Sequence, residues 1–178
     1  MSEKNDVYSE VKGQMRLSER IAAFIPGFRG YKEKEVRRES DRLIRNHLVL
    51  KLSTEKIDLR EISQKLADRR YFDVLTDMDR LNAKMDRVVE KVNHASYGYS
   101  GFFDAVKVKE DSLDRMIEFD NKLVDNITAL ATEIDAFTSD LASGNTSNLK
   151  FRVQSVTDKL ESLENTFDQR NEVIMGAS

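Results

Sequence analysis

Glu90 and His94 are the first side chains whose types and spacing could do chemistry. They are four residues apart, so on a helix they would lie one turn apart and form an ion pair or one edge of a metal site. A carboxylate-bridged diiron site needs a glutamate three residues before a histidine. Ile44 and Lys91 occupy those positions before His47 and His94. Since the chain has two histidines and no cysteine, we predict the ion pair and neither a metal nor another cofactor.

The motifs of nucleotide binding and nucleophilic catalysis are missing from the sequence. It has no Gly-x-x-x-x-Gly-Lys-Ser/Thr loop, no Gly-x-Ser-x-Gly turn and no Gly-x-Gly-x-x-Gly turn. Without cysteine it also lacks disulfides, thiolate metal ligands and cysteine nucleophiles. We therefore predict no catalytic, cofactor-binding or metal-binding residues and expect a protein that is not an enzyme. The lack of cysteine fits a reducing compartment, and we expect the cytoplasm.

Basic side chains gather in the first part of the chain. Residues 1–70 carry 17 Lys and Arg against 12 Asp and Glu, whereas residues 71–178 carry 12 against 20. The richest stretch includes Arg37, Arg38, Arg42 and Arg45. In one interpretation these arginines form a solvated helix face, paired one turn apart with acids such as Asp41 and Glu33. In the other they contact lipid phosphates, nucleic acid or an acidic protein partner. Nucleic acid is the least favoured of these because the whole chain has a net charge of -3.

Two glycine-containing loops, at residues 25–31 and 96–103, carry aromatic side chains. In an up-and-down path both loops would lie at the same end of the molecule, beside the basic stretch. Their aromatics either close the core at that end or form a docking surface for a membrane or a protein. The candidate interaction surface consists of Phe28, Arg29, Tyr31, Arg37, Arg38, Arg42, Arg45, Tyr97, Tyr99, Phe102 and Phe103.

The spacing of apolar residues predicts the helices that position these side chains. Apolar residues recur at alternating steps of four and three over residues 116–141, with a break at Asp120, and again over residues 149–167. This spacing predicts two amphipathic helices, joined at the polar residues 143–148 and folded back antiparallel as a coiled-coil hairpin. We interpret Asp120 and Asn82, which interrupt such series, as determinants of register or oligomeric state.

The earlier segments are less regular. We expect a helix over residues 6–24, a loop at Pro26, a second helix from Lys32 and a third that ends near Ala95. Possible N-cap residues place a turn or kink between the second and third helices at residues 53–58. The alternative is a single helix over residues 32–95, which would be about 96 Å long. A short extended piece could occupy residues 105–109 before a helix that begins near Glu110.

Composition agrees with this reading. The chain is 39% hydrophobic and 34% charged, with one proline and seven glycines, which is typical of a helical protein with a charged surface. It contains no apolar run near the roughly 20 residues that span a bilayer. We predict an all-α, antiparallel up-and-down bundle of four to five long helices, forming a single domain over residues 1–178 with frayed ends at 1–5 and 175–178.

For function we predict a non-catalytic protein–protein interaction or scaffold module, whose partner is another protein or a second copy of the chain. One alternative is a peripheral protein that binds an anionic membrane through the basic helix 32–52 and the aromatic loops. A second alternative is a small-ligand-binding bundle or an enzyme.

Overall fold

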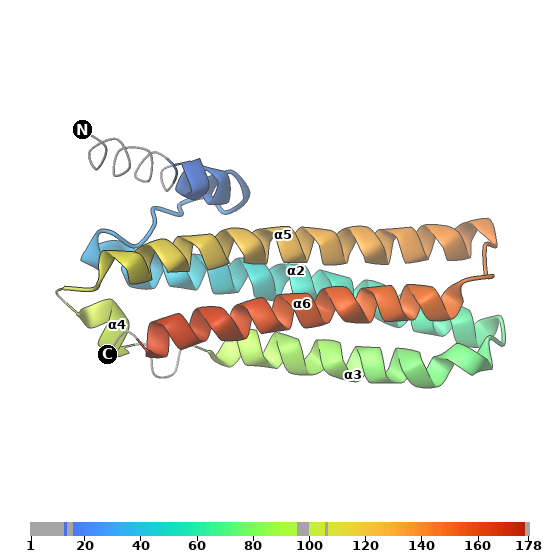
Figure 1. Cartoon of the computed structure of the whole chain (residues 1–178). Helices are drawn as coiled ribbons and strands as arrows, with labels where there is room; N and C mark the ends of the chain where they lie inside the picture. Colours follow the sequence, from blue (N-terminus) through green and yellow to red (C-terminus); the bar gives the residue numbers. More distant parts are fainter. Residues whose placement is uncertain (1–12, 14–15, 96–99, 106, 177–178) are drawn as a thin grey trace. The chain divides into compact units, whose positions relative to one another are not determined.

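The computed structural model describes residues 13, 16–95, 100–105 and 107–176, and α-helix is the regular secondary structure found among them (Figure 1). The helices are α2 (Lys34–Asp68), α3 (Phe72–His94), α4 (Ser100–Asp104), α5 (Glu110–Ser143) and α6 (Leu149–Met175). Residues 16–24 are also helical, and the expected start of that helix near residue 6 lies outside the described residues. The all-α prediction is confirmed. Residues 105 and 107–109 form no strand, and residue 106 of the extended piece considered there lies outside the described residues.

The chain divides into two compact units. Unit 1 consists of Met1–His47, Ser96–Val124 and Thr166–Ser178, and unit 2 consists of Leu48–Ala95 and Asp125–Asn165. In unit 2, segments of α2, α3, α5 and α6 lie side by side (Figure 1). The expectation of one domain over the whole chain stays a prediction. Among the described residues, no helix combines the length and apolar character needed to cross a bilayer.

The spacing of apolar residues on α5 and α6 correctly predicts the buried face of each helix. The buried positions are Met116, Leu123, Ile127, Leu130, Ile134, Phe137 and Leu141 on α5, and Leu149, Val153, Val156, Leu160, Leu163 and Phe167 on α6. The polar linker also ends α5 where expected. Gly144 has a φ of 75°, its N–H donates to the Leu141 carbonyl (3.3 Å), and the Asn145 N–H donates to the Asp140 carbonyl (2.9 Å). This is a Schellman cap, for which glycine is the favoured residue.

The expected turn at residues 53–58 is wrong, because α2 continues through it to Asp68. Thr54, one of the possible N-cap residues, bonds back into α2 instead: its hydroxyl donates to the Leu50 carbonyl (3.2 Å). The single-helix alternative is also wrong. The chain turns at residues 69–71, where Arg70 has a φ of 63°.

The turn after α2 is a Schellman cap built without glycine. The Tyr71 N–H donates to the Leu66 carbonyl (2.9 Å) and the Arg70 N–H to the Ala67 carbonyl (3.0 Å). Arg70 therefore holds the left-handed position that Gly144 holds after α5. Because neither glycine nor proline marks this turn, the spacing of punctuating residues could not locate it.

α3 starts later than expected, and this changes which of its residues face the core. Its buried series contains Val74, Met78, Leu81, Met85, Val88 and Val92, again at steps of four and three. Phe72, the first residue of α3, is out of step with this series and is 64% exposed. Its apolar side chain is therefore a surface feature of unit 2.

We predict that Arg70→Gly stabilises the protein by roughly 0.5–1 kcal/mol, because a left-handed backbone costs an L-residue about 1–2 kcal/mol and glycine recovers part of this after its own entropy loss. The measurement is urea unfolding followed by circular dichroism. Arg70→Ala is the matched control, since it removes the same side chain but keeps the strained backbone. A glycine variant no more stable than the alanine variant would contradict this account.

Candidate functional site

The loop after the first helical segment in unit 1 turns its aromatic side chains inward. The Phe28 N–H donates to the Ile25 carbonyl (3.2 Å) across Pro26 and Gly27, and Gly27 has a φ of 88°. Proline followed by a left-handed glycine is the signature of a type II turn. Phe28 and Tyr31, which are 5% and 0% exposed, pack edge to face with ring centres 5.8 Å apart. Both therefore belong to the core of unit 1.

The second aromatic group behaves in the same way where it is described. Phe102 and Phe103 lie on α4, are buried, and pack edge to face at 5.3 Å. Tyr97 and Tyr99 lie outside the described residues. For the described aromatics, burial corrects the docking-surface interpretation and favours the core-closing one.

The basic stretch is engaged in contacts within unit 1. Arg37 is buried and donates to the carbonyls of Tyr31 and Ala105, both at 2.8 Å. It therefore joins the first loop to the segment after α4, and it does not make the contact with Glu33 that its spacing suggested. Ser40, also buried, donates to the Gly30 carbonyl (2.7 Å).

The other arginines of the candidate surface form ion pairs. The pairs are Arg29 with Glu33 (3.3 Å), Arg38 with Asp104 (2.6 Å), Arg42 with Glu39 (2.6 Å) and Arg45 with Asp41 (2.8 Å). The Asp41–Arg45 pair was predicted from its spacing and is confirmed. Arg29, Arg38 and Arg42 keep about 60% of their side chains exposed, so they form a solvated face of this unit.

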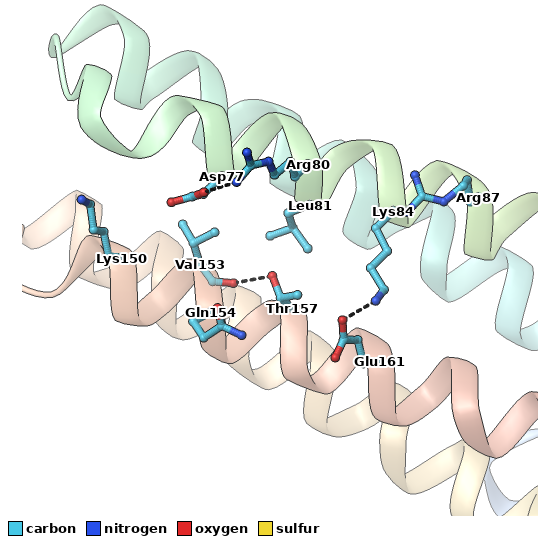
Figure 2. A pocket seen from close by; sticks show the side chains of 10 residues that line it. All are labelled: Asp77, Arg80, Leu81, Lys84, Arg87, Lys150, Val153, Gln154, Thr157 and Glu161. Atoms are coloured by element: carbon cyan, nitrogen blue, oxygen red, sulfur yellow. Dashed lines mark hydrogen bonds and ion pairs between the residues drawn. The ribbon is translucent and has the colours of Figure 1, made fainter.

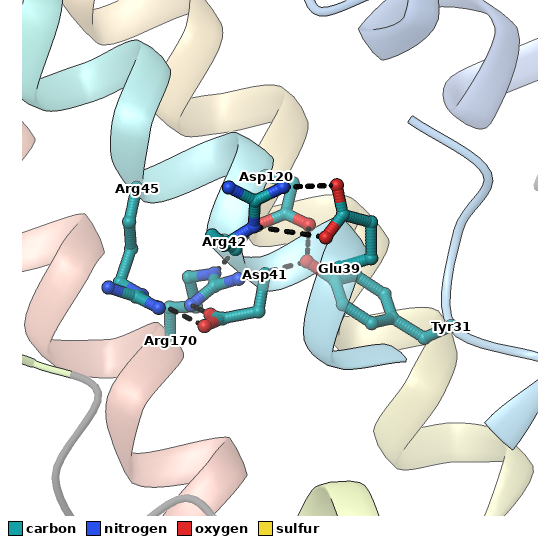
Figure 3. A network of polar contacts seen from close by, with 7 residues as sticks. All are labelled: Tyr31, Glu39, Asp41, Arg42, Arg45, Asp120 and Arg170. Atoms are coloured by element: carbon teal, nitrogen blue, oxygen red, sulfur yellow. Dashed lines mark hydrogen bonds and ion pairs between the residues drawn. The ribbon is translucent and has the colours of Figure 1, made fainter. Parts of the chain in front are cut away.

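A buried polar cluster lies at the centre of unit 1 (Figure 3). Arg170, on α6, is fully buried and donates to Asp120 on α5 (2.6 Å), to Asp41 on α2 (2.9 Å) and to the Tyr31 hydroxyl (2.9 Å). The Tyr31 hydroxyl in turn donates to Asp120 (2.6 Å). Because Arg45 pairs with the second oxygen of Asp41, two guanidinium groups balance two carboxylates.

The pKa values of this cluster are set by burial and by the neighbouring charges. Burial raises the pKa of Tyr31, and the negative charge of Asp120 raises it further, so the phenol stays a neutral donor. Burial also raises the pKa of Asp120, against the attraction of Arg170 and the hydrogen bonds. For Arg170, burial lowers the pKa, but Asp120, Tyr31 and Asp41 outweigh it and the pKa stays well above its ordinary value. A closed, satisfied cluster of this kind orders the fold; it presents no group to a substrate.

Tyr31, Asp41, Arg45 and Asp120 are named from the sequence, though not as one cluster, and Arg170 is missed. Asp120 was noticed because it interrupts the apolar series, but Arg170 was not, although it occupies the next position of the α6 series after Phe167. The signal that could have found the pair was a negative and a positive residue, Asp120 and Arg170, at positions of two apolar series where buried residues are expected.

We predict that Arg170→Met lowers the free energy of unfolding by about 3–5 kcal/mol, because it leaves the buried Asp120 and Asp41 short of a partner. The measurement is again urea unfolding. Arg42→Met is the matched control, since it also breaks an arginine–carboxylate pair but an exposed one, and we expect it to leave the midpoint nearly unchanged. Equal losses in the two variants would show that burial is not what matters.

Unit 2 holds a buried carboxylate of a different kind. Glu55 on α2 is 6% exposed, and its pKa is raised to about 7, first by burial and then by Asp58 and Asp135, with Lys51 opposing. In the unfolded state Glu55 loses its proton near the ordinary carboxyl pKa of 4.5, whereas in the folded state it keeps that proton up to about pH 7.

We predict that stability falls as pH rises from about 4.5 to about 7, because in that window the folded state binds more protons than the unfolded state. The loss is on the order of 2 kcal/mol, measured as melting temperature against pH. Glu55→Gln should flatten this dependence, whereas Glu61→Gln, an exposed acid on the same helix, should not. A wild-type profile that rises across the window would refute the assignment.

A basic groove opens between α3 and α6 in unit 2 (Figure 2). It has a volume of about 300 Å³. We define it by Arg80, Lys84 and Arg87 on α3 and Lys150 on α6, which line it together with two acids, Asp77 and Glu161. None of its residues was singled out from the sequence, because their order along the chain does not show that α3 and α6 are neighbours.

Unit 2 also exposes large apolar side chains. Leu50 and Ile57 on α2 are 67% and 60% exposed, and Phe72 and Phe151 are 64% and 66% exposed. Leu50 and Ile57 are seven residues apart, so they lie on the same face of the helix. We call Leu50, Thr54 and Ile57 the α2 outer face.

The two histidines and Asn82 are the remaining residues that the sequence analysis considered. Nε2 of His94 lies 3.0 Å from Oε2 of Glu90, and both side chains are exposed, so the two residues make the contact expected from their spacing. His47 is half-buried. Asn82 is half-buried and donates to Ser63 (2.8 Å), and its role in register stays a prediction. In the part of the chain that the structure describes, no group of three or more His, Asp and Glu could hold a metal ion.

No protein-family model, curated protein or solved structure matches this chain. Its function is therefore inferred from the arrangement of its own residues.

Proposed function

We propose that this chain is a non-catalytic protein–protein interaction module, built on an antiparallel up-and-down helical bundle, that self-associates through the α2 outer face. The single observation that carries the proposal is the exposure of Leu50 and Ile57 on one helix face. Exposed large apolar side chains at this spacing are what a second amphipathic helix packs against.

The contacts in unit 2 support the antiparallel path of its helices. Between α5 and α6, Asp140 contacts Arg152 and Asn126 contacts Ser162. Between α2 and α3, Lys56 contacts Asp86 and Ser63 contacts Asn82. In both cases the residue number rises on one helix as it falls on the other, as antiparallel neighbours require. The short linker after α5 fits a coiled-coil-like hairpin.

The chemistry of the α2 outer face also suits burial. The Thr54 hydroxyl is already bonded to the Leu50 carbonyl, so covering it leaves no donor without a partner. Lys51 and Arg60, both exposed, flank the face, which gives an apolar centre with a charged rim, the common anatomy of interfaces.

A second copy of α2 is the occupant we propose for this face. If two copies cross antiparallel about a two-fold axis near Thr54, Leu50 of each copy meets Ile57 of the other. The membrane alternative has less support, because the aromatics Phe28, Tyr31, Phe102 and Phe103 that would insert are buried. We also propose that the chain acts in the cytoplasm.

We predict that light scattering coupled to size-exclusion chromatography shows a dimer for the wild type and a folded monomer for Leu50→Gln with Ile57→Gln. Polar side chains would remove the apolar contact without disturbing the core. Lys51→Gln with Arg60→Gln changes neighbouring exposed positions and should leave the dimer intact. A wild type that stays monomeric at the highest attainable concentration would overturn self-association.

A further inference from the structure

We infer that the basic groove between α3 and α6 is a second binding site, which takes an extended acidic segment of a protein partner. The groove lies within unit 2 and shares no residue with the α2 outer face. The inference therefore goes beyond the proposed self-association and can be tested separately from it.

The charges that line the groove are unequal. Four cationic side chains face two carboxylates. Asp77 holds Arg80 (3.3 Å) and Glu161 holds Lys84 (2.5 Å). Arg87 and Lys150 form no ion pair within the described part of the chain, and both are exposed. The groove thus presents two cations whose charge is not offset by a direct partner, and this favours an anionic ligand.

Two neutral polar side chains of the groove, Thr157 and Gln154, already donate hydrogen bonds within α6. The Thr157 hydroxyl donates to the Val153 carbonyl (2.8 Å), and the Gln154 amide donates to Asp158 (2.7 Å). Recognition must therefore come from the cations, because the apolar lining residues Leu81 and Val153 are 1% and 3% exposed. An acidic segment can place several carboxylates along the groove, one for each of the cations spread over it.

The residues that line the groove are spread along the two helices, as Figure 2 shows. Its lining on α6 runs from Lys150 to Glu161, which at 1.5 Å per residue is about 16 Å. An extended chain covers that length with about five residues. Lys150 lies where α6 begins, and Arg87 lies at the opposite end of the α3 lining, so an extended segment could reach both while a compact anion could not.

The ion pairs inside the groove indicate that a partner would supply carboxylates to its cations. Lys84 and Arg80 already take carboxylate ligands from the chain itself. The Arg80–Asp77 pair is largely exposed, with the arginine side chain 78% accessible. Exposed pairs of this kind are weak, so a carboxylate of a partner can replace Asp77 at little cost.

The test uses the full chain and a fluorescein-labelled Glu-Leu-Glu-Leu-Glu peptide, with fluorescence anisotropy at low salt. We expect saturable binding that weakens as salt is added, and no binding of the matching Gln-Leu-Gln-Leu-Gln peptide. Arg87→Gln and Lys150→Gln should each weaken binding by about fivefold, the loss of one charge contact. Lys159→Gln, an exposed lysine of α6 outside the groove, is the matched control and should bind like the wild type.

Asp77→Asn provides a test in the opposite direction, because it frees Arg80 and removes a negative charge, and it should tighten binding. The inference is overturned by an absence of saturable binding, by equal losses in Lys150→Gln and Lys159→Gln, or by binding of inorganic tripolyphosphate with the same dependence on the groove while the peptide does not bind. Each result is independent of whether the chain dimerises, since the Leu50 and Ile57 variant can be titrated with the same peptide.

Discussion

Burying one guanidinium group constrains unit 1 more than any other single interaction. Arg170 is fully enclosed, and a charge in that position is tolerable only if carboxylates and hydroxyls reach it in good geometry. Tyr31 comes from the first loop, Asp41 from α2 and Asp120 from α5. The cluster can therefore form only when these segments are all in place, so it specifies one arrangement of this unit. Arg37 fixes the same loop from its other side through the Tyr31 carbonyl.

Unit 2 also buries an ionisable side chain, Glu55, but surrounds it with fewer compensating partners. Glu55 lies in a buried series on α2 with Leu48, Leu52, Leu59, Ile62 and Leu66, but its strongest electrostatic neighbours are the acids Asp58 and Asp135. Asp120 is paired directly with an arginine, whereas the cation that opposes the raised pKa of Glu55 is Lys51. Burial raises the pKa of both acids, but of the two only Asp120 has an arginine and a tyrosine hydroxyl as direct partners within the described part of the chain.

The sequence predicts much of this structure where local spacing decides the outcome. The steps of four and three on α5 and α6 mark residues that are in fact buried, and Gly144 marks the end of α5. The end of α2 could not be predicted, because Arg70 takes a left-handed conformation that usually selects glycine. The expected surface failed for Phe28, Tyr31, Phe102 and Phe103, since sequence alone does not say on which side of a loop an aromatic ring packs. The basic groove could not be predicted either, because its cations come from helices that are distant in the chain.

The function we propose rests on the α2 outer face, and the lack of cysteine in the chain allows a direct test of it. A single cysteine introduced as Thr54→Cys would be the only thiol, at the centre of that face, and a disulfide forms only when the two Cα atoms come within about 7 Å. Under mild oxidation the account predicts that Thr54→Cys forms a covalent dimer rapidly, whereas Lys159→Cys, an exposed position on α6, remains monomeric. Equal rates of cross-linking in the two variants, or none in either, would contradict the central claim that α2 pairs with α2.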